Sequence, residues 1–130
     1  MSHFGPAWLG LCIAFGIHVV DEALTDFLAV YNPMVRAVRA RFPFLPLPTF
    51  TFRRWLTGLV LAVVVLASLT PFAYRGAGWM RPLAYAFGIV MVGNGLLHLA
   101  GSVYMRKAMP GAYSAPLILA AAVFLLASVP

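Results

Sequence analysis

The chain has 130 residues, of which 63% are hydrophobic and only 9% are charged, and its formal net charge is +6. A soluble domain carries about 25% charged residues and about 45–50% apolar ones. A chain this short keeps too much of its surface exposed to hide such an excess of apolar side chains from water. The composition therefore excludes an ordinary soluble domain and predicts a single transmembrane helical domain over residues 1–130.

Four apolar stretches stand out, and all but the last have at least the roughly 20 residues that a helix needs to span the hydrocarbon of a bilayer. They are, in chain order, Pro6–Tyr31, Trp55–Tyr74, Pro82–Tyr104 and Ala115–Pro130. No basic segment precedes the first stretch, so we expect it to remain as a helix and not to be removed as a signal peptide. The last stretch is short for a full span and is expected to thin the bilayer locally or to end in the interface. The predicted fold class is all-α, a polytopic membrane protein with a bundle of four transmembrane helices.

The segment between the first two stretches is rich in arginine and proline. Within it, Met34–Phe42 is predicted to form a short interfacial helix, with its arginines towards lipid headgroups and its apolar side chains towards acyl chains. The prolines that follow cannot continue a helix, because each lacks an N–H and restricts the residue before it. An interfacial Arg/Pro-rich segment should therefore separate the first two transmembrane helices.

The nine basic residues lie mostly between the apolar stretches, where a membrane protein carries its orientation signal. The first and third connections hold seven of them, and the second holds only Arg75 and Arg81. The positive-inside rule then places both termini outside and the arginine-rich connection in the cytoplasm. The basic residues are thus interpreted as topology determinants and headgroup contacts, and no nucleic-acid partner is expected. Trp8, Trp55 and Trp79 fall near predicted helix ends, as interfacial anchors do.

All three acidic residues of the chain are gathered in the first apolar stretch, beside a histidine. Asp21 and Glu22 follow His18 by three and four residues, so they share a helix face with it. A charged side chain at mid-bilayer costs at least about 2.5–3.5 kcal/mol on insertion scales, so such residues usually face the bundle interior and are functional. Asp26 lies nearer to the cytoplasmic end, where solvent or an arginine can accommodate it. This cluster is the strongest indication of a functional site.

The third stretch contributes Asn94 and His98, which are four residues apart and lie on one helix face. Their depth in the predicted bundle matches that of His18, so the two helices can share a site. Two imidazoles with carboxylate and amide oxygens form a ligand set for a divalent metal. We therefore predict a metal site with His18, Glu22, Asp21 and His98 as ligands, zinc being favoured and iron or manganese possible. The single cysteine, Cys12, offers no disulfide or thiolate site and is expected to be a packing residue.

The same residues allow other interpretations. His18 could form a structural pair with Asp21 or Glu22, while the polar residues of the third stretch tie helices together. The acids could carry protons in a transporter. The two histidines could also be axial ligands of a b-type haem, although the neighbouring carboxylates disfavour this. His3 precedes the first stretch and is expected to be exposed.

Three motifs resemble a known family. His18-Val-Val-Asp21-Glu22 resembles the defining motif of the HXXEE family of small bacterial membrane proteins, with Asp in place of the first Glu. Asn94-Gly-Leu-Leu-His98 is similar to that family's downstream N-x-x-x-H motif, and the segment 109–116 resembles its Pro-Gly segment before the last helix. Together these motifs cover about residues 10–125. The resemblance implies a bacterial plasma-membrane protein and indicates which residues matter, since the family is defined by its motifs and not by a reaction.

In the Pro-Gly segment, Pro110 and Gly111 are interpreted as a turn before the last helix. Ser114 lies where that helix begins and is expected to be its N-cap. This serine could act as a nucleophile only if the fold brings it beside His98.

These predictions combine into one functional hypothesis. The protein is expected to be a small intramembrane metal-dependent enzyme, leaning towards a hydrolase, with a lipid-like or isoprenoid substrate. Glu22, Asp21 and Asn94 are its candidate catalytic residues, and iron in place of zinc would make it an oxidoreductase. The alternative is a proton- or cation-coupled transporter or channel subunit that uses the same buried residues. Membrane lipid is the expected partner, and a homodimer through glycine-rich faces is also possible.

Overall fold

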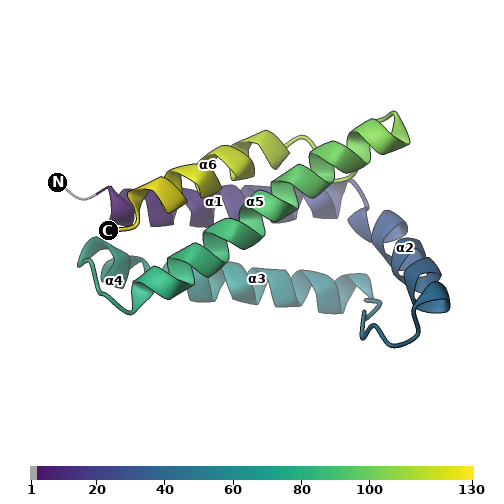
Figure 1. The fold of residues 1–130 in the computed structure, drawn as a ribbon, viewed down its shortest axis with the longest axis horizontal. Coiled ribbons are helices and arrows are strands. Elements are labelled where there is room, and N and C mark those ends of the chain that lie inside the picture. The colour runs from purple at the N-terminus through teal and green to yellow at the C-terminus, as the bar shows by residue number, and fades with distance from the viewer. Residues whose placement is uncertain (1–2) are drawn as a thin grey trace.

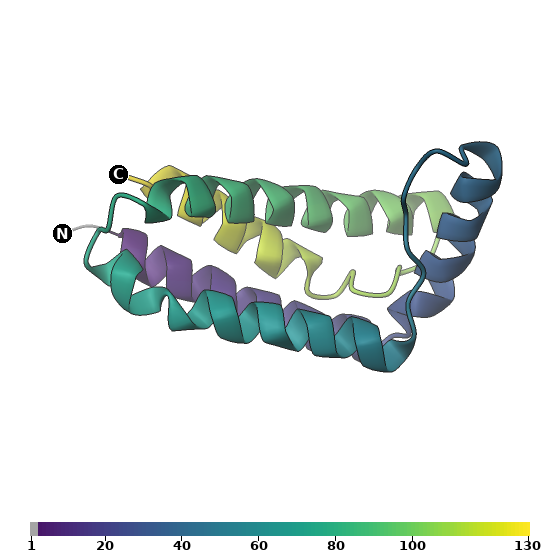
Figure 2. The same ribbon diagram turned by 90° about the horizontal axis from the view of Figure 1, so that it is seen from below.

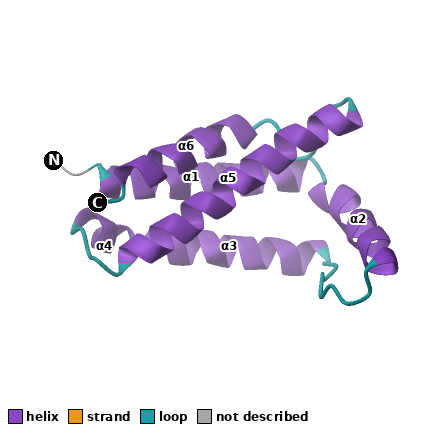
Figure 3. Cartoon of the chain, viewed as in Figure 1, coloured by secondary structure: helices purple, strands orange, loops and turns teal. Residues whose placement is uncertain are grey.

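The computed structural model describes residues 3–130, and that part of the chain is helical without any strand (Figure 3). The helices are, in chain order, α1 (Phe4–Leu24), α2 (Phe27–Arg41), α3 (Phe52–Ser68), α4 (Thr70–Tyr74), α5 (Met80–Met105) and α6 (Ala115–Ser128). Helices α1, α3, α5 and α6 run along the length of the molecule, and both termini lie at one end of it (Figure 1). Helix α2 lies across the opposite end of this bundle (Figure 2).

Three segments are long and apolar enough to cross a membrane. They are α1, the nearly continuous pair α3 and α4 (together Phe52–Tyr74), and α5. Helix α6 is apolar but has 14 residues, which makes it about 21 Å long at a rise of 1.5 Å per residue. The hydrocarbon core of a bilayer is about 30 Å thick. The predicted all-α fold is therefore confirmed together with three spans, whereas α6 is too short to count as a fourth by the same criterion.

The first predicted span is broken near its end. Asp26 adopts a left-handed backbone conformation with a φ angle of 58° between α1 and α2. The hydroxyl of Thr25 donates a 2.6 Å hydrogen bond to the carbonyl of Asp21, which gives the last turn of α1 a local alternative to continuing. The prediction of one helix over Pro6–Tyr31 is therefore wrong after α1. Helix α2 contains the end of that range from Phe27 onwards. It also contains most of the interfacial helix predicted over Met34–Phe42.

Helix α6 packs against both α1 and α5. Two glycines of α5 permit this close approach. A Cβ atom added at Gly95 would lie 3.1 Å from the Cβ of Leu119, and one added at Gly88 would lie 2.7 Å from Leu126. Small residues at helix interfaces serve this purpose in membranes, where close packing replaces the hydrophobic effect as the force between helices. The beginning of α6 is thereby held beside both helices that carry the predicted site.

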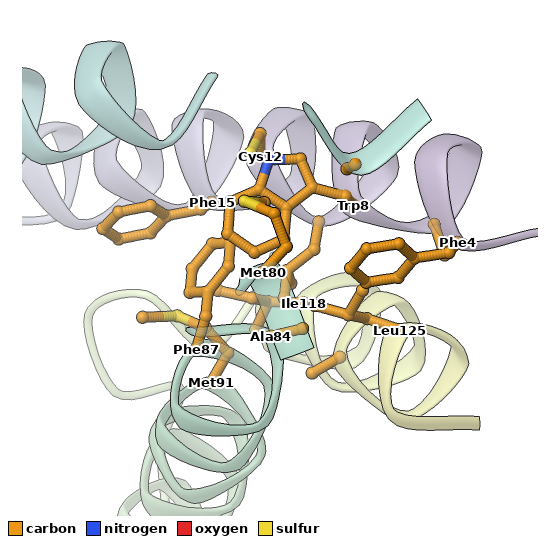
Figure 4. Close-up of a cluster of buried hydrophobic side chains, with 14 of the residues drawn as sticks. Phe4, Trp8, Cys12, Phe15, Met80, Ala84, Phe87, Met91, Ile118 and Leu125 are labelled. Carbon is orange, nitrogen blue, oxygen red and sulfur yellow. The ribbon is translucent and has the colours of Figure 1, made fainter. Parts of the chain in front are cut away.

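A buried apolar cluster fills the bundle between α1, α5 and α6 (Figure 4). Trp8 is fully buried in it and packs edge-on against Phe87, with ring centroids 5.5 Å apart. The indole N–H of Trp8 donates a 3.0 Å hydrogen bond to the carbonyl of Leu66, which satisfies its one polar atom inside the bundle. The prediction of an interfacial role is therefore wrong for Trp8, and Trp55 is buried as well. Cys12 is part of the same cluster, in agreement with its predicted packing role.

Candidate metal centre

Three buried side chains meet inside the half of the bundle that lies nearer to α2. His18 and Glu22 are one helical turn apart on α1, and His98 projects from α5. The Nε2 atom of His98 lies 3.0 Å from Oε1 of Glu22, and Nε2 of His18 lies 3.4 Å from the same oxygen. The exposed fractions of these side chains are only 0%, 6% and 4% for His18, Glu22 and His98. The cluster is thus enclosed by the helices.

The spacing of the donor atoms suits a small divalent cation. One ligand atom from each of the three residues can be chosen so that all lie within 4.8 Å of one another. Zinc bonds to nitrogen and oxygen are about 2.0–2.2 Å long, so two ligand atoms in a tetrahedral site are about 3.4 Å apart. The two imidazole rings lie edge to face with centroids 4.7 Å apart, which leaves no room for a haem between them. The described residues can therefore hold a metal ion at this place.

Buried polar atoms without a partner concentrate around the same cluster. Among the described residues, four buried side-chain atoms lack a hydrogen-bond partner. Three of them are Nε2 of His18, Nδ1 of His98 and Oδ1 of Asn94. Leaving such an atom unpaired costs free energy, so each case calls for a physical reason. A bound cation would satisfy the histidine nitrogen that faces Glu22, whereas Oδ1 of Asn94 is free to accept a hydrogen bond from another group.

Asp21 lies outside the three-residue group and binds Ser114 at the start of α6. Its Oδ2 atom accepts hydrogen bonds from the backbone N–H of Ser114 at 2.8 Å and from the Ser114 hydroxyl at 2.7 Å. The same hydroxyl oxygen lies 2.7 Å from Nδ1 of His18. It also lies 3.3 Å from the carbonyl of Gly111, but the shorter bond to a carboxylate is the stronger one. The hydroxyl therefore donates to Asp21 and accepts from His18.

This chain of hydrogen bonds fixes the tautomer of His18. The Ser114 hydroxyl donates its one proton to Asp21 and can only accept from His18. Nδ1 of a neutral His18 must therefore carry the ring proton and donate it. Its Nε2 atom is then left as a lone pair beside Glu22, in the form that a metal requires. Metal-binding histidines commonly hold their second nitrogen in this way. Asp21 and Ser114 thus orient His18 from outside the group of three candidate ligands.

Ser114 stands at the N-cap position of α6, as predicted, but it does not cap the helix with its side chain. Ser114 precedes α6, but its backbone is already helical and its side chain makes no capping hydrogen bond. The hydroxyl is engaged instead by Asp21 and His18, which lie on α1. The serine also meets His18 and not His98, so the arrangement set out above for a nucleophile is not the one observed.

The turn before α6 forms one wall of the centre. Gly111 has a φ angle of 85°, which glycine adopts without strain. A Cβ atom added there would lie 2.6 Å from Cε1 of His98 and 2.9 Å from Cγ of Glu22. The N–H of Gly111 donates a 3.1 Å hydrogen bond to the hydroxyl oxygen of Thr25. The predicted turn is confirmed. Glycine is required at position 111 because its φ angle is positive and because His98 and Glu22 leave no space for a side chain.

The remaining predicted residues take separate positions. Asn94 is one helical turn before His98 on α5 and is only partly buried. Asp26 is exposed, and no carboxylate of residues 3–130 pairs with an arginine or lysine. His3 is exposed, as expected. Sequence reasoning missed the site roles of Ser114 and Gly111, and their only signal was the Pro-Gly segment before the last helix.

Residues 8–125 match the model of a family described as "Protein of unknown function with HXXEE motif". The chain belongs to the HXXEE family. No curated protein and no solved structure matches it. The two acidic positions of the HXXEE motif have different surroundings in this chain, since Asp21 binds Ser114 while Glu22 contacts both histidines. The shorter Asp at the first acidic position thus belongs to the hydrogen-bond chain that orients His18.

Proposed function

We propose that this HXXEE protein is a small membrane hydrolase that holds one divalent metal ion with His18, Glu22 and His98. The observation that supports this most is the unpaired Nε2 atom of His18, which is buried beside a carboxylate and is left as a lone pair by the Asp21–Ser114 hydrogen bonds. Two nitrogens and a carboxylate without thiolate suit zinc best, and iron or manganese can occupy such a set. Iron would turn the reaction into an oxidation.

Three protein ligands, His18, Glu22 and His98, would match the number of protein ligands in catalytic zinc sites. The ion would supply Lewis-acid activation of a water molecule and of a carbonyl or phosphoryl oxygen. Asn94 would hydrogen-bond the substrate, because its Oδ1 atom is buried without a partner one helical turn before His98. Asp21 would act through Ser114 as a positioning residue, a role that differs from the ligand role predicted from the sequence.

An enclosed site is favoured over a transport pathway by the distribution of polar groups. The interior of the bundle towards the termini is filled by apolar side chains, including Phe4, Trp8 and Leu11, which are fully buried. A proton or cation pathway would need polar groups or water along that length. A site closed on one side and surrounded by apolar helices suits the hydrolysis of a lipid-like or isoprenoid substrate.

The proposed membrane placement has four spans in a bacterial plasma membrane, with both termini outside. It is supported by the position of both termini at one end of the bundle and of α2 at the other (Figure 1). Helix α2 carries Arg36, Arg39 and Arg41, which would lie at the cytoplasmic headgroups. Helix α6 would cross only with local thinning of the bilayer. The metal centre would then lie in the cytoplasmic half of the membrane.

The hydrolase proposal is tested with purified protein in detergent and two chromogenic substrates, a long-chain ester and a long-chain phosphate ester of p-nitrophenol. We expect hydrolysis that a chelator removes and zinc restores. Glu22→Gln should abolish it, whereas Asp26→Asn, which changes an exposed carboxylate outside the centre, should leave it intact. Equal rates for the two variants, or rates unaffected by chelation, would contradict the proposal.

A further inference from the structure

Two cavities meet at the candidate metal centre. The larger has a volume of about 690 Å³, lies between α2 and α5, and reaches His98. The smaller has a volume of about 360 Å³, lies between α1, α2 and α3, and reaches Glu22. They share three lining residues, Phe27, Tyr31 and Asn94. The two spaces are therefore adjacent, and the centre lies where they adjoin.

The larger cavity has the lining of a site for an apolar chain. Apart from Asn94, His98 and two tyrosines, its walls are apolar residues and a glycine, among them Val30, Leu97 and Met105. Its volume lies in the range of small-molecule sites, which are about 300–1,000 Å³ and mostly apolar. Its rim includes Leu97 and Tyr104, whose exposed fractions are 71% and 89%. Such a rim faces lipid in a membrane, so a chain can enter between α2 and α5.

The smaller cavity has a cationic wall. Arg54, in the first turn of α3, lines it together with Glu22 and Asn94. No arginine or lysine of residues 3–130 lies within ion-pair distance of a carboxylate, so the guanidinium of Arg54 has no acidic partner within the described chain. A guanidinium is the side chain best suited to bind a phosphate or carboxylate through paired hydrogen bonds. Because Glu22 also lines this cavity, charge complementarity favours an anionic group only at its Arg54 side.

We propose that the ligand is a single-chain amphiphile with an anionic head, bound with its head at Arg54 and its chain along the groove between α2 and α5. The bond that joins head and chain would then lie beside Glu22, His98 and Asn94. This assignment names the substrate class of the proposed hydrolase and so rests on that function. The binding itself depends only on the two cavities and can be measured without catalysis.

The test is equilibrium binding of radiolabelled dodecyl phosphate to the full chain in phosphatidylcholine nanodiscs, with the signal of empty nanodiscs subtracted. Dodecanoate and dodecanol are measured alongside. We expect saturable binding of dodecyl phosphate or dodecanoate, the tighter of which identifies the head, and dodecanol should bind about tenfold more weakly. Loss of one charge-assisted hydrogen-bonding group has an effect of at least this size.

Two matched pairs of variants locate the ligand. Arg54→Gln should weaken binding about tenfold, whereas Arg53→Gln, a neighbouring arginine that does not line the cavity, should not. Ala100→Phe should fill the groove and weaken binding by a similar factor, whereas Ala86→Phe, at another exposed alanine of α5, should not. Circular dichroism melts of each variant show that it is folded. Binding equal to that of the parent in both Arg54→Gln and Ala100→Phe, or no saturable binding at all, would overturn the proposal.

The metal content of the same preparations separates the two proposals. Protein that holds one metal ion per chain but binds none of the amphiphiles would overturn this inference and leave the metal centre intact. Protein that binds an anionic amphiphile but retains no metal would overturn the hydrolase proposal and support the binding site.

Discussion

Replacing Gly111 by alanine should damage the metal centre without changing any of the three proposed ligands. The added Cβ atom would lie 2.6 Å from Cε1 of His98 and 2.9 Å from Cγ of Glu22, closer than real Cβ contacts allow. The first neighbour is a ring buried in the bundle and the second belongs to the carboxylate side chain. Neither side chain can move away without changing the distance of 3.0 Å between Nε2 of His98 and Oε1 of Glu22.

The free-energy cost of Gly111→Ala has two parts, one from the backbone and one from packing. A left-handed backbone costs a residue other than glycine about 1–2 kcal/mol, and this part affects the stability of the fold. Forcing extra volume into a packed region costs about 1–3 kcal/mol. Because metal binding must restore the ligand geometry against this second cost, the dissociation constant for zinc should rise about fivefold to 150-fold in Gly111→Ala.

Gly76→Ala is the matched control. Gly76 also has a positive φ, of 65°, but a Cβ atom added there would meet nothing within 4 Å. It should therefore share the backbone cost and lower the thermal midpoint, while leaving zinc affinity unchanged. Competition with a chromogenic zinc chelator in detergent measures both affinities. Equal affinities for Gly111→Ala, Gly76→Ala and the parent would show that the turn does not constrain the ligands of the centre.

Two more predictions rest on single contacts, and a third rests on the proposed membrane orientation. Ser114→Ala should weaken zinc binding about tenfold to 100-fold, because it removes the hydroxyl that orients His18; the same zinc competition measures it. Trp8→Phe should destabilise the fold by about 1 kcal/mol through the lost hydrogen bond to a backbone carbonyl, as read from thermal melts. A thiol-reactive reagent that cannot cross membranes should label Arg75→Cys in intact cells and Arg39→Cys only after permeabilisation, if both termini lie outside.

Each of these has its own control. Ser128→Ala removes a hydroxyl that bonds only a local carbonyl on α6, and zinc affinity should not respond to it. Trp79→Phe changes a half-exposed tryptophan and should be close to neutral in the melts. Labelling of Arg39→Cys before permeabilisation would reverse the proposed orientation. Zinc affinity unchanged in Ser114→Ala would remove the serine from the chain that orients His18.

The sequence was a sufficient guide to the presence of the long apolar helices and to the three residues that meet in the candidate centre. The apolar composition indicates that the protein lies in lipid. A spacing of four residues brings His18 and Glu22 to one face of a helix, independently of how the other helices pack. His98 lies on another helix, so residue spacing alone does not predict that it joins His18 and Glu22. It was found because ionisable groups are so rare in apolar spans that two such groups at similar depth are expected to meet.

What the sequence did not reveal depends on how segments distant in the chain pack together. The break after α1 comes from a local hydrogen bond of Thr25 and a left-handed Asp26, and hydropathy does not register either. The roles of Ser114 and Gly111 arise because α6 packs between α1 and α5, which brings residues about 90 positions apart into contact. A hydroxyl just before a helix predicts a side-chain cap on local grounds. In this fold the Ser114 hydroxyl binds the carboxylate of Asp21, which is distant in the sequence, and makes no cap.

Elemental analysis of protein purified without chelators shows whether His18, Glu22 and His98 hold a metal ion. We expect one divalent metal ion per chain in the parent and in His3→Ala, whose histidine is exposed and precedes α1. We expect loss of that ion in His98→Ala protein that remains folded. Folded parent protein without stoichiometric metal, or equal metal content in His98→Ala and His3→Ala, would contradict the proposed metal centre.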